Sequence, residues 1–174
     1  MERVGGKLIH RGTLISVRAD MFRYEDGETV ERELVLHPGA VAIVAHDEER
    51  LWMVRQPREA VGEDALLELP AGKLDVEGES PLEAAQRELG EEIGREAAEW
   101  NELKRFYTSP GFANEQVTLF EATDLKAVPQ KLQDDERIEI VEFPLSELDS
   151  AVAQCNDAKS LIGLLLLRES LQGG

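Results

Sequence analysis

Residues 72–95 read GKLDVEGESPLEAAQRELGEEIGR, and this stretch carries the strongest structural signal in the chain. Ser80 suits a helix N-cap, Pro81 suits the first helical position, and Glu83 would complete a capping box. Apolar residues recur at the spacing of one helix face, at Leu82, Ala85, Leu89 and Ile93. Gly94 is typical of a helix end. The stretch therefore predicts a glycine-containing turn followed by an amphipathic helix.

Glu88 and Glu92 stand four residues apart on this helix, so their side chains project from one side. At about 100° per residue they flank the apolar face, which places them at the edge of the core. Like charges at this spacing destabilise a bare helix by a few tenths of a kcal/mol. A divalent cation would offset that repulsion, because Mg²⁺ prefers carboxylate and phosphate oxygens. The alternative is a solvated acidic face on an acidic protein.

The same stretch resembles the Nudix box, which pairs a glycine and a glutamate with a helix carrying Arg-Glu and Glu-Glu at fixed spacing. Seven residues separate Glu79 from Arg87, and the segment that follows fits the pattern as Arg87-Glu88-Leu89-Gly90-Glu91-Glu92-Ile93-Gly94. Two positions depart from it. Six residues rather than five separate Gly72 from Glu79, and Arg95 replaces the closing aliphatic residue. The insertion precedes the helix and leaves the helix register intact.

The rest of the chain alternates between predicted strands and helices. Strands are expected at residues 7–18, 29–36, 39–45, 51–56, 66–69, 105–108, 116–122 and 138–143, with a turn at 25–27. Two more helices are expected at 146–154 and 158–171. This order predicts an α/β protein, an α/β/α sandwich around a mixed sheet, preceded by an antiparallel β arm. The Nudix resemblance implies the same fold. We assign residues 1–38 to the arm and 39–174 to the hydrolase domain.

Composition limits the classes of partner. The chain has 174 residues and a net charge of −17, which argues against nucleic-acid binding, because that needs a basic surface. The single Cys155 excludes an internal disulfide and favours a cytoplasmic setting. The N-terminus lacks an apolar signal core, and the longest apolar run, residues 161–167, is too short to span a membrane.

The two strands of the arm have no obvious partner within the hydrolase domain. Open edge strands are commonly paired or covered, because they otherwise promote aggregation. In the resembling enzymes such an arm crosses to a second subunit and helps to form the substrate cleft. We therefore expect a homodimer with twofold symmetry.

Nudix enzymes hydrolyse a nucleoside diphosphate linked to another group. The resemblance implies that Mg²⁺, with Mn²⁺ as the alternative ion, is bound by Glu88 and Glu92, by the Ala71 carbonyl, and by Glu91 as a further ligand. It also implies that Arg87 orients these glutamates and that Glu79 has a structural or orienting role. Gly72 is expected to serve backbone conformation rather than chemistry.

Several segments resemble the ADP-ribose pyrophosphatase branch of the family. Pro110 follows the box at the offset typical of that branch, and Glu115 corresponds to a glutamate that contacts the distal ribose. Arg55 is the candidate phosphate ligand, with Arg58 as the second choice. Glu68 is a candidate acceptor from adenine or a ribose hydroxyl. The aromatic residues of this region are candidates for base stacking, although core packing is expected for at least two of Phe106, Tyr107 and Phe112.

The acidic segment at residues 133–137 occupies the position of the catalytic loop in that branch. The resemblance implies that Glu136 is a metal-associated glutamate, and it aligns Asp134 with the usual general base, which is a glutamate. Aspartate is one methylene shorter, so Glu136 is an alternative base. A charged surface turn is the plain alternative for the whole segment.

These residues predict Mg²⁺-dependent hydrolysis of ADP-ribose to AMP and ribose 5-phosphate, by water activated at Glu136 or Asp134. Three alternatives remain: another nucleoside diphosphate sugar such as GDP-mannose or a dinucleotide as substrate, a non-catalytic ADP-ribose sensor, or a structural interaction protein. The last leaves the Glu88 and Glu92 pair unexplained.

Overall fold

The computed structural model describes residues 1–130 and 137–173. The chain divides into two compact units. The first comprises Met1–Gly39 and Phe106–Gln116, and the second comprises Ala40–Arg105 and Val117–Gly174. The prediction assigned residues 1–38 to an arm. The first unit contains this arm and also Phe106–Gln116, a segment from later in the chain.

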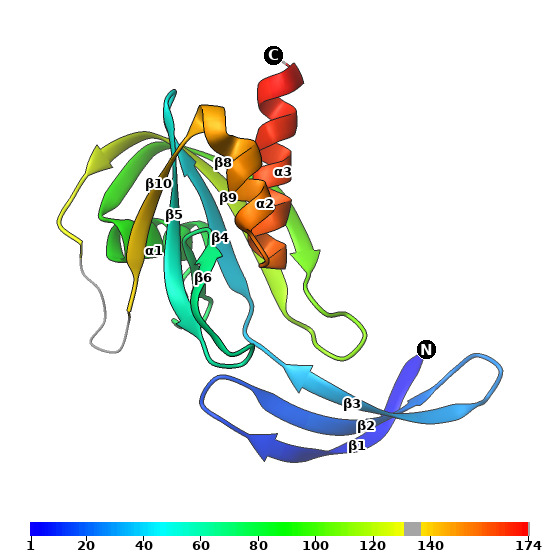
Figure 1. Cartoon of the computed structure of the whole chain (residues 1–174). Coiled ribbons are helices and arrows are strands. Elements are labelled where there is room, and N and C mark those ends of the chain that lie inside the picture. Colours follow the sequence, from blue (N-terminus) through cyan, green and yellow to red (C-terminus); the bar gives the residue numbers. More distant parts are fainter. Residues whose placement is uncertain (131–136, 174) are drawn as a thin grey trace. The chain divides into compact units, whose positions relative to one another are not determined.

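The first unit contains a three-stranded antiparallel sheet of β1 (Glu2–Arg11), β2 (Ser16–Arg23) and β3 (Thr29–Leu36), in that order (Figure 1). The predicted single strand over residues 7–18 is wrong. The chain turns after Gly12, whose N–H donates to the Ile15 carbonyl at 2.8 Å. The predicted turn at residues 25–27 is confirmed by the bond from Gly27 N to Tyr24 O at 3.1 Å.

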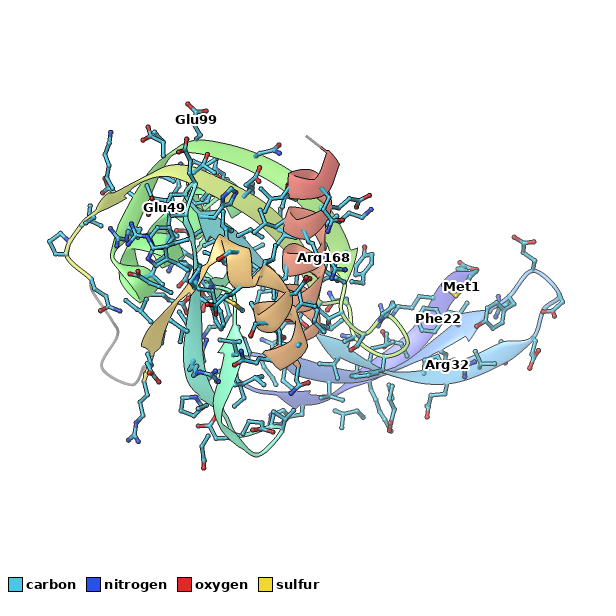
Figure 2. All side chains as sticks on the ribbon, turned by 45° about the horizontal axis from the view of Figure 1, so that its top comes forward. Met1, Phe22, Arg32, Glu49, Glu99 and Arg168 are labelled. Atoms are coloured by element: carbon cyan, nitrogen blue, oxygen red, sulfur yellow. The ribbon has the colours of Figure 1, made fainter. Side chains whose placement is uncertain are left out.

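One buried carboxylate joins two strands of this sheet. Asp20 on β2 is 3% exposed, and it accepts hydrogen bonds from Arg18 and from Arg3 on β1. In Figure 2, the labelled side chain of Phe22 lies on β2 and that of Arg32 lies on β3 of this sheet. The burial of a charge is tolerated here because two guanidinium groups pair with it.

The second unit is built on a mixed sheet with the strand order β10-β5-β4-β9-β8, in which β6 also pairs with β5 and β7 with β4. β4 and β9 run parallel, whereas β5 pairs antiparallel with β4, β6 and β10. The strands are β4 (Ala40–His46), β5 (Arg50–Arg58), β6 (Glu63–Glu68), β7 (Ala71–Lys73), β8 (Arg95–Tyr107), β9 (Gln116–Ala127) and β10 (Glu139–Pro144).

Helices cover both faces of this sheet, as the sandwich prediction requires (Figure 1). Helix α1 (Pro81–Ile93) lies on one face, and α2 (Leu148–Gln154), which follows the short turn η1 (Leu145–Glu147), and α3 (Ala158–Gly173) lie on the other. Along β4, Ile43 belongs to the core beneath α1, whereas Val44 approaches Gly163 of α3. This alternation is the period of a strand buried on both faces. No helix in residues 1–130 and 137–173 is long and apolar enough to cross a membrane.

The predicted ends of α1 are confirmed. Ser80 and Glu83 form the capping box, and Gly94 ends the helix in the left-handed conformation at φ 61°. One member of the predicted apolar face is wrong: Leu82 is 38% exposed, whereas Ala84 is buried.

The sequence prediction missed most of β8 and all of β7. The strand predicted at residues 105–108 begins at Arg95, directly after the helix cap, and the sequence gives little sign of this because most of its residues are polar or exposed. The predicted glycine-containing turn begins with a short strand, because Ala71–Lys73 pairs with β4 as β7.

Candidate active site

The two stacked glutamates of α1 are buried between the helix and the sheet. Glu88 is 6% exposed and Glu92 is 3% exposed. Glu92 Oε2 accepts a hydrogen bond at 2.9 Å from the backbone N–H of Ala71, at the start of β7. A carboxylate is costly to bury unless hydrogen bonds or cations compensate. The two carboxyl groups therefore lie together at the boundary of helix and sheet, at the edge of the core where the sequence placed them.

Gly72 allows the strand to approach these carboxylates. A Cβ atom at Gly72 would lie 1.9 Å from Glu88 Oε1 and 2.0 Å from Glu88 Cδ. Gly72 is not among the glycines with positive φ. The glycine is thus needed for close approach, not for the backbone conformation that the sequence suggested.

Arg87 connects three glutamates of the box. Its Nε and Nη2 donate to the two carboxylate oxygens of Glu79 at 2.9 and 3.0 Å. Its Nη1 donates to Glu88 Oε1 at 2.7 Å and to Glu91 Oε2 at 3.1 Å. Hydrogen bonding to Glu79 is the largest cause of the raised pKa of Arg87, so the guanidinium stays charged. The expected orienting roles of Arg87 and Glu79 agree with these contacts.

The donor set suits a hard divalent cation. The Glu88 carboxylate occupies the space that a side chain at position 72 would fill, and the Glu92 carboxylate lies beside the Ala71 backbone, so β7 meets both candidate oxygen donors. Among the described residues, no three histidine, cysteine, aspartate or glutamate side chains are grouped as a ready metal site. Glu91 contacts Arg87 in this structure, and Glu136 lies outside the described residues, as does Asp134.

A second buried carboxylate lies at the end of β6, just before β7. Glu68 is fully buried, and Arg58 donates to its two oxygens through Nε at 2.5 Å and Nη2 at 2.7 Å. Lys159 on α3 donates to Glu68 Oε2 at 2.5 Å. Both oxygens therefore already accept hydrogen bonds within the chain, and the predicted contact of Glu68 with adenine or ribose stays a prediction.

The two candidate phosphate arginines differ in their surroundings. Within residues 1–130 and 137–173, the hydrogen bonds of the Arg55 side chain are long, to Ala65 O at 3.4 Å and to Gln154 Oε1 at 3.3 Å. The pKa of Arg58 is raised, first by its hydrogen bond to Glu68, and the charge of Glu92 contributes. The charge of Arg58 therefore interacts with that of Glu92 in the glutamate helix α1. The sequence ranked it second because its partner Glu68 becomes apparent only when β5 and β6 pair.

Pro110 and Glu115 belong to the first unit. Glu115 Oε2 accepts a hydrogen bond from the Thr108 hydroxyl at 2.5 Å. A hollow of about 300 Å³ lies in this unit and is lined by Leu34, Val35, Leu36, Tyr107, Pro110, Phe112, Ala113 and Asn114. Tyr107 is 56% exposed and Phe112 is 55% exposed, so the expected core packing of at least two of the three aromatic residues is wrong.

Comparison with known proteins gives consistent matches. The model of the NUDIX domain matches residues 35–162. An ADP-ribose pyrophosphatase of Bacillus subtilis (strain 168) is 39% identical over 171 residues, which cover 94% of this chain and 91% of that protein. An ADP-ribose pyrophosphatase of Mycobacterium tuberculosis (strain ATCC 25618 / H37Rv) is 40% identical over 149 residues, covering 84% and 72%. The crystal structure of an ADP compounds hydrolase superposes with a TM-score of 0.87 at 26% identity, covering 99% of this chain and 94% of that one.

Proposed function

The chain belongs to the Nudix family and is a Nudix hydrolase, and from this premise we propose that it hydrolyses the diphosphate linkage of ADP-ribose to AMP and ribose 5-phosphate. The observation that carries the proposal is the buried pair of Glu88, which lies against Gly72, and Glu92, which is bonded to the Ala71 N–H. The two relatives named ADP-ribose pyrophosphatase support the choice of substrate, since one of them aligns over nearly the whole chain.

Nudix hydrolases generally use divalent metals, and we propose Mg²⁺ for this enzyme, with Mn²⁺ as the alternative ion. Glu88, Glu92 and the Ala71 carbonyl would hold it, with Glu91 and Glu136 as further ligands. Held by these residues, a divalent ion would supply charge neutralisation at the diphosphate oxygens and a binding position for water. Arg87 holds Glu88 in place, and the Ala71 N–H holds Glu92, so the chain itself fixes the donors before substrate arrives.

For substrate binding we propose Arg58 ahead of Arg55 as the phosphate contact. The Arg58 guanidinium is held by Glu68 and lies in the field of Glu92, and a planar guanidinium suits phosphate oxygens. In the first unit, Glu115 is proposed to bind the distal ribose, and Pro110 to shape the loop that presents it.

The proton from the attacking water needs an acceptor. We keep Glu136 and Asp134 as the candidate general bases, with Glu91 as a third catalytic candidate. The contact between Glu91 and Arg87 favours an orienting function for Glu91, because Arg87 Nη1 donates to its Oε2. Each of the three acids can be replaced by its amide, and turnover is then measured at saturating Mg²⁺. The largest loss of turnover would identify the general base.

We further propose that the enzyme is a cytoplasmic homodimer associated through the N-terminal sheet. All ten residues of β1 are exposed, including the large apolar side chains of Val4, Leu8 and Ile9. An exposed edge strand with apolar side chains favours pairing with a second copy. The single cysteine, Cys155, is buried and unpaired, which suits a reducing compartment. A monomer by light scattering at micromolar protein would contradict the assembly.

The activity is tested with a substrate panel in Mg²⁺ that contains ADP-ribose, GDP-mannose and a dinucleotide, with the products identified by mass. We expect ADP-ribose to give the highest kcat/KM and to yield AMP and ribose 5-phosphate. A higher kcat/KM for another compound would refute ADP-ribose as the preferred substrate. Binding of ADP-ribose without turnover would favour the sensor and refute the hydrolysis.

A further inference from the structure

Lys159 connects α3 to the end of β6. Its side chain is 15% exposed, and its Nζ donates to Glu68 Oε2 at 2.5 Å and to Asp157 Oδ2 at 2.8 Å. Lys159 is one residue into α3, whereas Glu68 is 91 residues earlier on β6. The ion pair therefore joins the first turn of the last helix to the strand that leads into Ala71 and Gly72.

The first turn of α3 is itself firmly held. Ser160 is fully buried, its Oγ accepts from Leu69 N at 2.7 Å, and the same hydroxyl donates to Asp157 Oδ2 at 2.5 Å. Burial raises the pKa of Asp157, but the charge and hydrogen bonds of Lys159 and Ser160 outweigh it, so the net shift is downward. Asp157 thus remains charged and keeps the ammonium of Lys159 at Glu68.

Glu68 is hydrogen-bonded both to Lys159 of this turn and to Arg58. Its carboxylate is fully buried, so its orientation depends on its hydrogen-bond partners. Arg58 bonds to both oxygens, and Lys159 bonds to one of them. If Lys159 were lost, Arg58 would be the one remaining cation bonded to this buried carboxylate among the described residues, and the geometry of the Arg58 pair would no longer be fixed from both sides.

We propose that Lys159 is a positioning residue for the hydrolysis: by holding Glu68 it fixes the orientation in which Arg58 meets the diphosphate. This inference rests on the proposed function and deepens it. Lys159 needs no contact with substrate, because its effect passes through two hydrogen-bonded neighbours. Its contribution should therefore depend on the presence of Arg58.

A double-mutant cycle with Lys159→Met and Arg58→Met tests this dependence. Methionine keeps the apolar stem of each side chain and removes its charge. We expect Lys159→Met to lower kcat/KM about tenfold in the wild-type background, mainly through a higher KM, and to change it by less than about twofold once Arg58 is replaced. Additive losses in the two backgrounds would overturn the proposal.

Lys126→Met on β9 is the matched control, because Lys126 is an exposed lysine of the same unit. We expect it to leave KM unchanged, and an equal rise in KM would overturn the inference, since loss of any lysine would then suffice. Thermal unfolding separates positioning from stability: if Lys159→Met loses activity only in proportion to its unfolded fraction, the proposal also fails.

The cycle is measured on the compound of the panel that the wild type hydrolyses best. Preference for a compound other than ADP-ribose would refute the proposed substrate while the cycle still decides the role of Lys159. If the wild type hydrolysed no nucleoside diphosphate compound, both proposals would fall together.

Discussion

Gly72 on β7 lies directly against the carboxylate of Glu88 on α1, so close that a Cβ atom at position 72 would stand 1.9 Å from Glu88 Oε1. The neighbouring residue Ala71 donates its N–H to Glu92. One short strand therefore touches both stacked glutamates. The residue inserted between Gly72 and Glu79 falls after this contact in the chain and before the helix, so the glutamates keep their register.

Gly72→Ala should reduce activity severely without unfolding the protein. The added methyl group must displace the Glu88 carboxylate, and a displacement of about 1 Å in such a site can lower the rate on the order of 100-fold. The measurement is kcat/KM beside a circular dichroism melt. Gly90→Ala is the matched control on α1, because the nearest atom to a Cβ there is 3.8 Å away. It should raise helix stability by up to about 1 kcal/mol and keep activity. Equal activity of the two variants would contradict the account.

Arg87→Lys should weaken metal-dependent activity. A lysine ammonium cannot reproduce the fork that bonds Glu79, Glu88 and Glu91 together. Loss of an outer residue that orients metal ligands typically costs about 10–100-fold in affinity or activity. We expect a higher Mg²⁺ concentration at half-maximal rate, measured by titration at fixed substrate. An unchanged Mg²⁺ titration would show that Arg87 has only a structural function.

Ser160→Ala should destabilise the second unit. The change leaves the buried Leu69 N–H without its acceptor and removes a hydrogen bond to Asp157, at a cost of about 1–3 kcal/mol. Urea unfolding measures the loss. Ser170→Ala on the same helix changes an exposed residue whose hydroxyl donates to the Leu167 carbonyl at 2.8 Å, a carbonyl near the helix end, and should change stability by less than about 0.5 kcal/mol. If the two variants were equally stable, the buried hydroxyl would not anchor α3.

The Asp20 pair should give a pH-dependent contribution to stability. Hydrogen bonds from Arg18 and Arg3 lower the pKa of Asp20 to about 2, from an ordinary value near 3.9. Because the folded pKa is depressed, the stabilisation is complete above about pH 4 and is lost as the pH falls toward about 2. The difference in urea midpoint between wild type and Asp20→Asn should be constant from pH 7 to 5 and shrink below pH 4. A difference that grew on acidification would contradict this sign.

The local signals of the sequence located α1 well. Its capping box, its glycine end and the stacking of Glu88 and Glu92 depend on residues within one or two helical turns of each other. The mixed sheet between helices also followed from the alternation of elements.

Contacts between distant segments could not be predicted in the same way. The partners of Glu68 come from β5 and from α3, and Arg58 gained importance over Arg55 only through that pairing. The strand β8 was mostly missed because none of its residues is buried and most are polar or exposed, so backbone pairing rather than an apolar pattern defines it. The break after Gly12 likewise depends on a hydrogen bond to Ile15 that alternation alone does not indicate.

Glu88 and Glu92 are proposed to hold the divalent ions that make the diphosphate cleavable. The decisive measurement is the turnover of ADP-ribose by Glu92→Gln over a Mg²⁺ titration, with the melting temperature recorded alongside. We expect turnover to fall by more than about 100-fold, the upper end for residues that only orient metal ligands, at every Mg²⁺ concentration, while the protein stays folded. Near-normal turnover of the folded variant at saturating Mg²⁺ would contradict the account.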